Sequence, residues 1–354
     1  LHFDGQRYRV GPDSAGANPG PACYRRGGPL TVTDANAMVG KIQAEFFPPV
    51  FGPDGDQRLD TDIVNKKFGE LALEINKATG DKRTAVEVAD GFLMIAVDNM
   101  ANAIKQISTQ RGHDVTDYTL NCFGGAGGQH ACLVADALGI TNVFIHPFAG
   151  VLSAYGMGLA EHRVMRERAV ESILNDELVT KLADTIQDLQ QECETEMKRQ
   201  GVNPANMHAV HRLHLRYEGT DSPLEVNFSD NTKMVAAFEK AHHMQYGFIA
   251  PEKNHIVEQV TVEVIGGASE VEEQDVIVNG NVDQPHPLAE IETYMEGALV
   301  PTDVFDRKSL IPSQRVDGPA VIIEANSTTV IEPGWSAEIT SRNHLMLRRV
   351  KPRP

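Results

Sequence analysis

The sequence predicts an α/β domain followed by a β-rich α+β region, and three stretches of the chain predict this fold class. Residues 118 to 139 have the pattern of a strand, a glycine turn and a helix that ends at Gly139. Helix and strand patterns alternate around this unit, between residues 84 and 160. Strand patterns dominate after residue 257, where Pro and Gly separate short runs. We therefore expect one domain over residues 1 to 165 and a second over 166 to 354.

Composition limits the class of protein. With 354 residues, the chain is long enough for two domains that each bury a core. It carries 32 Lys and Arg against 49 Asp and Glu, and the net charge of −17 disfavours nucleic acid and anionic membranes as partners. The longest apolar run, Phe92 to Val97, is far too short to span a bilayer. Because the chain begins without Met or a signal peptide, we expect it to be a piece of a longer protein.

The four cysteines predict a reducing compartment. They show no CxxC pair or other metal-ligand spacing. Cys122 and Cys132 flank the glycine turn, where a small buried hydrophobic residue is the expected role of each. This usage predicts a cytoplasmic protein with no cysteine-bound metal.

The glycine turn is the strongest local signal for a ligand site. Gly124, Gly125, Gly127 and Gly128 separate the predicted strand from the predicted helix. Glycine adopts positive φ easily and has no Cβ, so a ligand can lie directly on such a backbone. The N-terminus of the following helix presents N–H groups to an anion. The spacing matches neither the dinucleotide motif nor the P-loop, so a tight turn without a ligand stays open as the alternative.

The chain before the glycine turn is predicted to hold a hairpin, a long loop and three helices. The hairpin covers residues 3–10, and the loop that follows is dense in Gly and Pro. Long loops in compact domains are usually functional, and we expect this one to form a rigid wall. A short helix then runs over 35–41, with Thr33 or Asp34 as its N-cap. The two longer helices are expected at 61–77 and, after a capping box at 84–87, up to Gly112.

After residue 165 the patterns predict strands and two amphipathic helices. His208, His211 and His214 fall on alternating faces of one predicted strand, a spacing that disfavours a shared metal ion. The predicted strands are 164–172, 208–217, 224–228, 257–265, 275–279, 297–304, 319–324 and 328–339, and the predicted helices are 176–200 and 233–246.

Three stretches resemble one protein family. FGGAGGQHACLVADALGI at the glycine turn, GPDSAGANPGPACYRRGGPLTVTDAN near the start and STTVIEPGW near the end are similar to the 5-oxoprolinase and N-methylhydantoinase A family. The family is ATP-dependent and belongs to the actin, hexokinase and heat-shock-protein-70 superfamily of folds. Gly128 and Gln129 before His130 resemble the oxoprolinase branch more than the hydantoinase branch.

The resemblance implies a fold and a set of binding residues. Residues 1–165 are expected to be the C-terminal part of an actin-like nucleotide-binding domain, and 166–354 an accessory domain. The four glycines and Gln129 are expected to line the adenosine side of the cleft. The resemblance also makes Asn99 and Asn102, on the helix before the turn, weak candidates for contact with the base, but a solvated polar face is the favoured interpretation of both. The long loop and Asp34 are expected to border the cleft, with helix capping as the structural alternative for Asp34.

The resemblance also implies a reaction, the ATP-driven opening of 5-oxo-L-proline to L-glutamate. An unstrained lactam is a poor electrophile, and ATP activates its amide oxygen with the help of Mg²⁺. The family places its phosphate-binding hairpins upstream, and residues 1 to 117 contain no Walker lysine or comparable turn. We therefore expect no catalysis by this chain alone. The expected partners are a cyclic amide and a hydantoinase-B-type region, in an oligomer. The alternative is an ATP-binding activation or regulatory subunit of a hydantoinase or ketone carboxylase complex.

Two side chains are candidates for catalysis besides Asp34. His130 stands in the first turn of the helix, where the helix dipole disfavours its protonation. Its possible roles are, in order, a structural hydrogen bond, a nucleotide contact and a general base towards the substrate. Cys23 is a weaker candidate for a nucleophile, because no histidine lies near it in the sequence.

Overall fold

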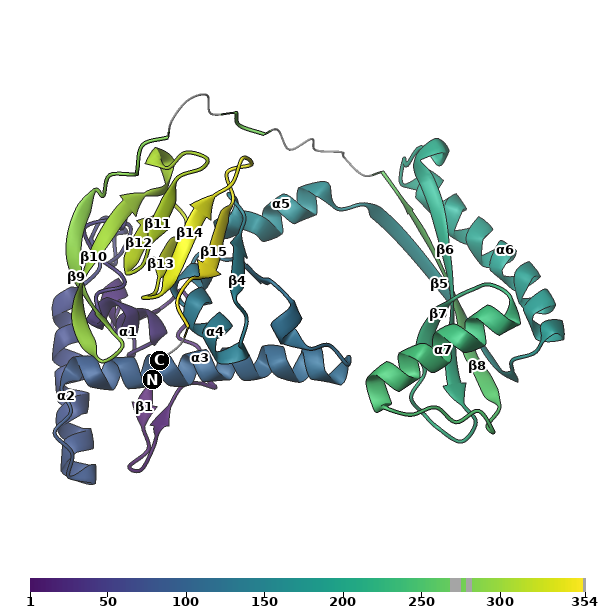
Figure 1. Ribbon diagram of the computed structural model, residues 1–354, viewed down its shortest axis with the longest axis horizontal. Helices are drawn as coiled ribbons and strands as arrows, with labels where there is room; N and C mark the ends of the chain where they lie inside the picture. The colour runs from purple at the N-terminus through teal and green to yellow at the C-terminus, as the bar shows by residue number, and fades with distance from the viewer. Residues whose placement is uncertain (268–274, 278–281, 353–354) are drawn as a thin grey trace. The chain divides into compact units, whose positions relative to one another are not determined.

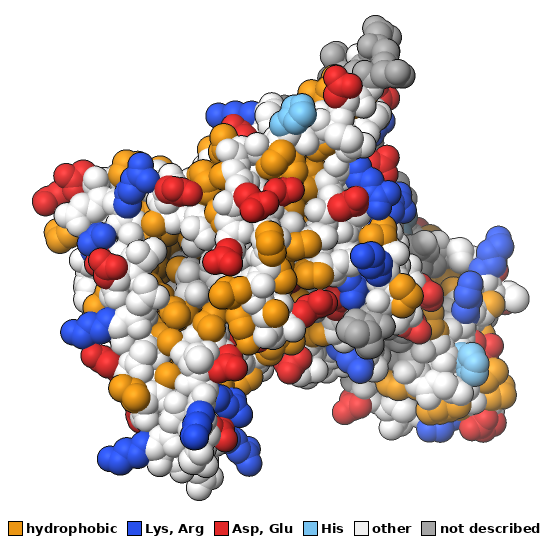
Figure 2. Space-filling view, turned by 60° about the vertical axis from the view of Figure 1, so that its left-hand side comes forward, with side chains coloured by type: hydrophobic (Ala, Val, Ile, Leu, Met, Phe, Trp, Pro, Cys, Tyr) orange, Lys and Arg blue, Asp and Glu red, His pale blue; other side chains and the backbone are white. Residues whose placement is uncertain are grey.

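Figure 1 shows the computed structural model, which describes residues 1–267, 275–277 and 282–352. The chain divides into two compact units. The first contains Leu1–Thr109, Asp114–Leu152 and Glu273–Pro354, and the second contains Gln110–His113 and Ser153–Glu272. No helix of the described residues is long and apolar enough to cross a membrane. On the face drawn in Figure 2, basic side chains lie interspersed among acidic ones.

The first unit is organised around a five-stranded sheet built from two parts of the chain that lie far apart in the sequence. Strand β3 (Leu120–Cys122) runs parallel to β4 (Asn142–Ile145). The other edge of β4 pairs antiparallel with β15 (Leu345–Arg349), with Leu345 opposite Ile145. Strands β14 (Trp335–Ile339) and β11 (Arg315–Asp317) complete the order β11-β14-β15-β4-β3.

This pairing differs from the predicted division at residue 165. Strands β9 to β15 belong to the first unit, so residues 166–354 do not form one separate compact unit. The physical reason is the free edge of β4, whose backbone groups are satisfied by β15. Strands β9, β11 and β15 were not predicted. Of the strand expected at 275–279, residues 275–277 lie in no strand, and 278–279 lie outside the described residues.

A second sheet packs on the same core. It consists of β9 (Ala289–Met295), β10 (Ala298–Asp306), β12 (Ala320–Ile323) and β13 (Thr328–Ile331), in the order β13-β12-β10-β9. Ile322 and Ile331 of this sheet share a buried cluster with Trp335, with helix α4 (Ala131–Leu138) and with the five-stranded sheet. The hairpin between β12 and β13 is thereby held against the segment that contains the glycine turn.

The N-terminal region of the unit agrees with the predicted elements. Strands β1 (His2–Phe3) and β2 (Tyr8–Arg9) form the hairpin, and the long loop after it includes the short turn η1 (Ala22–Tyr24). Helices α2 (Thr61–Thr79) and α3 (Ala85–Gln110) share one core with α1 (Val32–Met38). The predicted capping box is confirmed, because Glu87 accepts a hydrogen bond of 2.7 Å from the backbone of Thr84 and its own N–H points to the Thr84 hydroxyl. Helix α5 (Leu152–Leu159) follows β4.

The start of α1 differs from the prediction. Its N-cap is Thr31, and Asp34 occupies the third helical position of a second capping box. The prediction of Thr33 or Asp34 as the N-cap was therefore wrong by two or three residues. The cause is a reciprocal contact: the Asp34 carboxylate reaches back to the Thr31 backbone N–H over 2.7 Å.

The second unit is a four-stranded antiparallel sheet with two helices. Its strands are β5 (His162–Ile173), β6 (Met207–Tyr217), β7 (Leu224–Asn227) and β8 (His255–Gly266), in the order β5-β8-β6-β7. Helices α6 (Asp176–Arg199) and α7 (Asn231–Tyr246) match their predicted ranges within a few residues. His211 contacts Gln190 of α6, whereas His214 contacts Thr261 of β8, so these two histidines point to opposite faces of the sheet.

One buried ion pair joins the first and last parts of the first unit. Lys41, just after α1, lies 2.6 Å from Glu332 in the turn between β13 and β14, and both side chains are less than a tenth exposed. Burial raises the pKa of Glu332, and the ammonium group of Lys41 opposes that rise. Two charges leave water to make this contact, so their mutual attraction must offset a large desolvation cost.

We predict that Lys41→Met lowers the free energy of unfolding by about 3–5 kcal/mol, because it leaves the Glu332 carboxylate buried and unpaired. The double variant Lys41→Met, Glu332→Met should regain most of that loss, since two apolar side chains of similar size need no charge partner. Urea titrations of the three proteins measure both effects. Equal losses in the single and double variants would show that the charge on Glu332 contributes nothing to the cost.

Candidate functional site

A cavity of about 370 Å³ lies beside the glycine turn. Three segments far apart in the sequence form most of its walls: the loop after α1, the turn itself and the tip of the β12–β13 hairpin. Tyr24, before α1, and Thr33, on α1, complete them. All three segments belong to the first compact unit. The lining residues are Tyr24, Thr33, Ile42, Phe46, Phe47, Pro48, Val50, Phe51, Gly125, Ala126, Gln129, Ile323, Glu324, Ala325, Asn326, Ser327 and Thr328.

The chemistry of this wall suits an uncharged, flat ligand. Four of the lining side chains are aromatic, and Tyr24 and Phe51 lie with ring centroids 4.6 Å apart. Glu324 carries the only formal charge among the described lining residues, and its carboxylate accepts a hydrogen bond from Ser327. Because no Lys, Arg or His lines the cavity, its wall offers no cation to a phosphate or a carboxylate.

The glycines of the turn serve close packing more than unusual backbone angles. Among the four, only Gly124 has positive φ, at 91°, so the backbone angles of the other three do not require glycine. A Cβ on Gly125 would lie 2.8 Å from the carbonyl oxygen of Asn326, and one on Gly128 would lie 2.7 Å from that of Thr328. These Cβ atoms would thus meet the backbone of the β12–β13 hairpin. The turn is therefore glycine-rich because the hairpin packs directly on it.

Gln129 is the side chain that the turn brings to the cavity. Residues Gly127–Gln129 form a short 3-10 turn, η3, and α4 begins at Ala131. Gln129 is 6% exposed, and its Oε1 accepts a hydrogen bond of 3.0 Å from Nδ2 of Asn36 on α1. Its Nε2 has no acceptor among the described residues. The N–H groups of Gln129 are thus the polar end that this side chain offers to a ligand.

His130 is held by the same asparagine. Its Nε2 lies 3.1 Å from Asn36 Nδ2, a contact that is a hydrogen bond only when Nε2 carries no proton. The pKa of His130 is lowered from 6.5 to about 4, because burial disfavours the imidazolium and the charge of Lys41 repels it. The ring is therefore neutral at pH 7.

Asp34 and Cys23 are fully engaged inside the protein. The two carboxylate oxygens of Asp34 accept hydrogen bonds from the backbone N–H groups of Ala22, Cys23 and Thr31 and from the Thr31 hydroxyl. Asp34 therefore ties the long loop to α1 and does not line the cavity. Burial and the adjacent Asp34 raise the pKa of the Cys23 thiol, so it stays protonated at neutral pH.

Asn99 and Asn102 are not brought to the cavity. Both side chains are exposed on α3, and neither lines the space beside the glycine turn. Four other members of the predicted set, Gly124, Gly127, Gly128 and His130, form the turn and its support without lining the cavity. Gly125 and Gln129 are the two predicted residues that line it.

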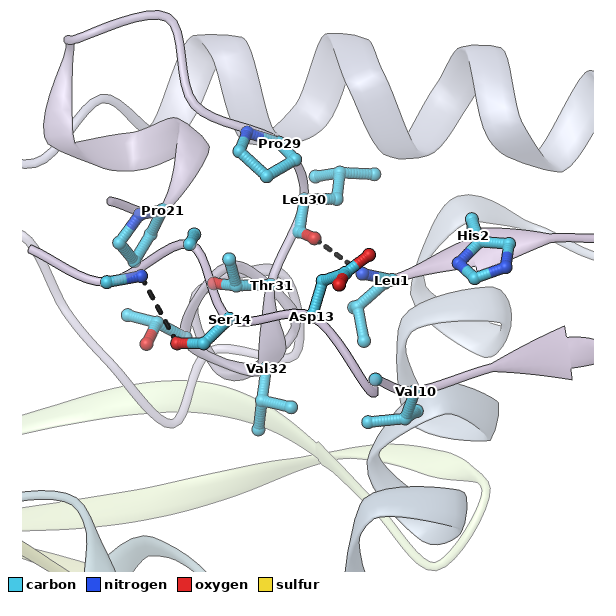
Figure 3. Close-up of a pocket in the computed structure, with 14 residues that line it drawn as sticks. Leu1, His2, Val10, Asp13, Ser14, Pro21, Pro29, Leu30, Thr31 and Val32 are labelled. Carbon is cyan, nitrogen blue, oxygen red and sulfur yellow. Dashed lines mark hydrogen bonds between the residues drawn. The ribbon is translucent and has the colours of Figure 1, made fainter. Parts of the chain in front are cut away.

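The long loop encloses a second cavity, of about 580 Å³ (Figure 3). Asp13, Ser14 and Pro21 of the loop line it together with Thr31 at the start of α1. The Ser14 hydroxyl accepts a hydrogen bond from the backbone of Gly16, which shapes this part of the loop. The loop therefore acts as a wall, as predicted, although the space that it encloses is not lined by Asp34.

The rest of the site was only weakly indicated by the sequence. The aromatic wall comes from FFPPVF at 46–51, which combines three phenylalanines with two prolines in a segment without regular structure. Aromatic residues concentrated in a loop were the available signal. Asn36 and part of the hairpin tip at 324–328 lie in stretches that resemble the family, but these residues did not themselves indicate their roles, which depend on contacts with residues about 90 and 200 positions away.

We predict that Gly125→Ala and Gly128→Ala each lower the free energy of unfolding by about 1–3 kcal/mol, because each added Cβ would overlap the hairpin backbone. Gly69→Ala on α2 is a matched control. Its Cβ would meet nothing within 4 Å, so the higher helix propensity of Ala should leave stability unchanged or raise it. Chemical denaturation of the three variants tests the packing, and unchanged stability at positions 125 and 128 would contradict it.

Because His130 is neutral in the folded chain, the free energy of unfolding should depend on pH. Between about pH 6.5 and pH 4 the unfolded chain binds a proton at this position that the folded chain does not, so stability falls as the pH falls through this window. The contribution lost is about 2–3 kcal/mol. In His130→Gln, the difference in unfolding free energy between pH 7 and pH 4 should shrink by that amount. An identical pH profile in the variant would refute the assignment.

Comparison with known proteins identifies the family to which these residues belong. Residues 1–166 match the family model described as Hydantoinase/oxoprolinase, and residues 171–350 match the model described as Hydantoinase/oxoprolinase C-terminal domain. The boundary between the two models lies near residue 165, whereas the compact units divide the chain differently. Residues matched by the second model thus supply the hairpin that closes the cavity.

Several relatives match nearly the whole chain. It is 34% identical to a 5-oxoprolinase of Dictyostelium discoideum, in a match that covers 96% of this chain and 27% of the relative. It is also 34% identical to 5-oxoprolinase 1 of Arabidopsis thaliana, in a match that covers 98% of this chain and 28% of the relative. It is 28% identical to the caprolactamase subunit alpha of Pseudomonas jessenii, in a match that covers 94% of this chain and 48% of the relative. The chain thus spans about a quarter to a half of the length of these relatives.

Two solved structures share the fold. One is the ATP-dependent caprolactamase of Pseudomonas jessenii, with a TM-score of 0.81 at 24% identity, over 99% of this chain and 51% of the other. The other is a nucleotide-free acetone carboxylase, with a TM-score of 0.71 at 20% identity over the same shares. The two family models together cover nearly all of the residues described above, and the chain belongs to the hydantoinase/oxoprolinase family.

Proposed function

We propose that this chain is part of a longer ATP-dependent hydrolase of cyclic amides, with 5-oxo-L-proline as its substrate. The observation that carries the proposal is the aromatic cavity at the glycine turn, with Gln129 at its wall and no cation among its lining residues. Such a wall accepts the nucleoside end of ATP and rejects the phosphates. The identity to 5-oxoprolinases over nearly the whole chain supports the substrate. We also propose that residues 1–165, together with an upstream region, form an actin-like fold.

The chain's own residues hold the nucleoside and exclude water around it. Phe46, Phe47 and Phe51 line the cavity with aromatic rings on which a base stacks, and Gln129 supplies a polar group beside them. Bound ATP supplies the activation of the lactam oxygen that makes ring opening by water feasible. The described residues contain no group of three or more His, Cys, Asp or Glu that could hold a metal ion. Mg²⁺ and the phosphates are assigned to an upstream region, and a B-type region is proposed as the partner.

Each predicted catalytic residue has a supporting role in this proposal. His130, neutral and bonded to Asn36, acts as a structural contact beneath the turn, the first of the roles considered for it. Asp34 fixes the loop that carries Cys23 and Tyr24. The general base for water is then assigned to a region outside this chain. We also propose that the full-length protein is cytoplasmic and oligomeric.

A second candidate is an ATP-binding activation or regulatory subunit. The absence of Lys, Arg, His and Cys among the described lining residues favours it, because such a cavity binds a ligand without acting on it chemically. In that case nucleotide binding changes the conformation, and the chemistry occurs on a partner.

We predict that the full-length protein containing this chain releases glutamate and phosphate from 5-oxoproline and ATP, whereas the 354-residue chain alone hydrolyses no ATP. The phosphate contacts that position the reacting groups lie outside the cavity described here. Coupled assays of glutamate and phosphate release measure both. ATP consumption without glutamate would favour the regulatory alternative. ATP turnover by the isolated chain would show that no upstream region is needed.

A further inference from the structure

We infer that Asn36 is a positioning residue that sets the hydrogen-bonding polarity of the cavity, so that the cavity selects a ring whose buried edge presents an acceptor atom to Gln129. The inference deepens the proposed function and rests on it, because it names the feature of the adenine ring that the site recognises. It starts from the three buried side chains Asn36, Gln129 and His130.

The contacts of the three side chains are all satisfied when His130 carries its ring proton on Nδ1. Asn36 is 1% exposed, and its Nδ2 contacts both Gln129 Oε1 at 3.0 Å and His130 Nε2 at 3.1 Å. A carboxamide nitrogen has two hydrogens and therefore serves two acceptors at once. In this tautomer of the neutral ring, Nε2 has no proton and accepts one of the two hydrogens. The other hydrogen goes to Gln129 Oε1, which fixes the orientation of the Gln129 amide.

A fixed amide presents one polarity to the ligand. With Oε1 bound to Asn36, the Gln129 group that remains for the cavity is Nε2, a donor without an acceptor among the described residues. A ligand that covers this N–H group removes it from water, so a ligand atom that accepts from it is favoured over one that does not. Adenine carries such acceptors at its ring nitrogens N1, N3 and N7, and it fits the aromatic wall as a flat, uncharged ring.

The cyclic amide is the less suitable occupant of this cavity. 5-Oxoproline carries a carboxylate, whereas the described lining contains Glu324 and no cation. Burial of an anion beside a carboxylate is unfavourable. The structure therefore favours the adenine ring, and the acceptor facing Gln129 is one of its three ring nitrogens.

Single-atom analogues of ATP in the full-length protein test the inference. We expect one of 1-deaza-, 3-deaza- and 7-deaza-ATP to show a KM raised by about tenfold or more over that of ATP, because it lacks the acceptor that Gln129 serves. In Asn36→Asp the carboxylate can only accept, so the Gln129 amide turns its Oε1 to the cavity. The penalty on that one analogue should then disappear. It should disappear also in Gln129→Met, which removes the donor without changing the other walls.

The exposed Asn65 of α2 provides the matched control, because Asn65→Asp makes the same chemical change away from the cavity and should keep the penalty. Equal KM values for ATP and all three analogues in the wild-type protein would overturn the inference. A penalty that persists in Asn36→Asp and Gln129→Met would overturn it as well, and so would a change confined to the KM for 5-oxoproline.

Failure of the hydrolase proposal can be distinguished from failure of the inference about Asn36. If the full-length protein consumes no ATP, the hydrolase proposal fails, and equilibrium dialysis with adenosine and its three deaza analogues still tests the cavity. Weaker binding of one analogue, abolished by Asn36→Asp, would support the role of Asn36 independently of catalysis. Equal binding of all four nucleosides, or no binding of any, would overturn it.

Discussion

The pairing of β4 with β15 is the contact on which the rest of the first unit depends. Four residue pairs from Leu345 to Arg348 align the end of the chain with the strand that follows the glycine turn. Once this edge is paired, Trp335 of β14 is buried over α4, where its ring N–H donates to Asp136. The preceding hairpin is then carried to the turn, and the carbonyl of Asn326 fits where Gly125 and Gly150 have no side chain. A long-range strand pairing thus creates the wall of a cavity whose opposite wall lies near residue 50.

The buried Lys41–Glu332 pair adds a second constraint to the same junction. It joins the residue after α1 to the turn after β13, so it fixes the N-terminal segment relative to the hairpin. Apolar packing alone would tolerate small shifts between these segments, whereas a desolvated ion pair loses most of its attraction when its geometry loosens. We infer that the ion pair aligns the N-terminal segment with the hairpin. Asn36 lies on α1 only a few residues before Lys41, and its contacts with the turn need that alignment.

Local physics predicted the elements well and the site only in part. Helices α2, α3 and α6 carry caps and a continuous apolar face, so their ranges could be read from residues close together in the sequence. The glycine turn and Gln129 were found for the same reason. The compact units divide the chain elsewhere than at residue 165 because β15 pairs with β4, about 200 residues earlier in the sequence, and the periodicity of a strand does not identify its partner. The aromatic wall was missed because Phe46 and Phe51 lie in a segment whose role appears only when the hairpin tip closes over it.

The protonation state of His130 and the polarity of the cavity are a single constraint. Asn36 can donate to His130 only while Nε2 of the ring is unprotonated, and the same amide group holds Gln129. An imidazolium at this place would need an acceptor, and the Asn36 carbonyl oxygen is buried without a partner among the described residues. Protonation would therefore turn the Asn36 amide over, and Gln129 would follow it. Burial and the charge of Lys41 keep the ring neutral well below physiological pH. The ion pair that aligns the two segments thus also preserves the single hydrogen-bond pattern on which recognition at the cavity depends.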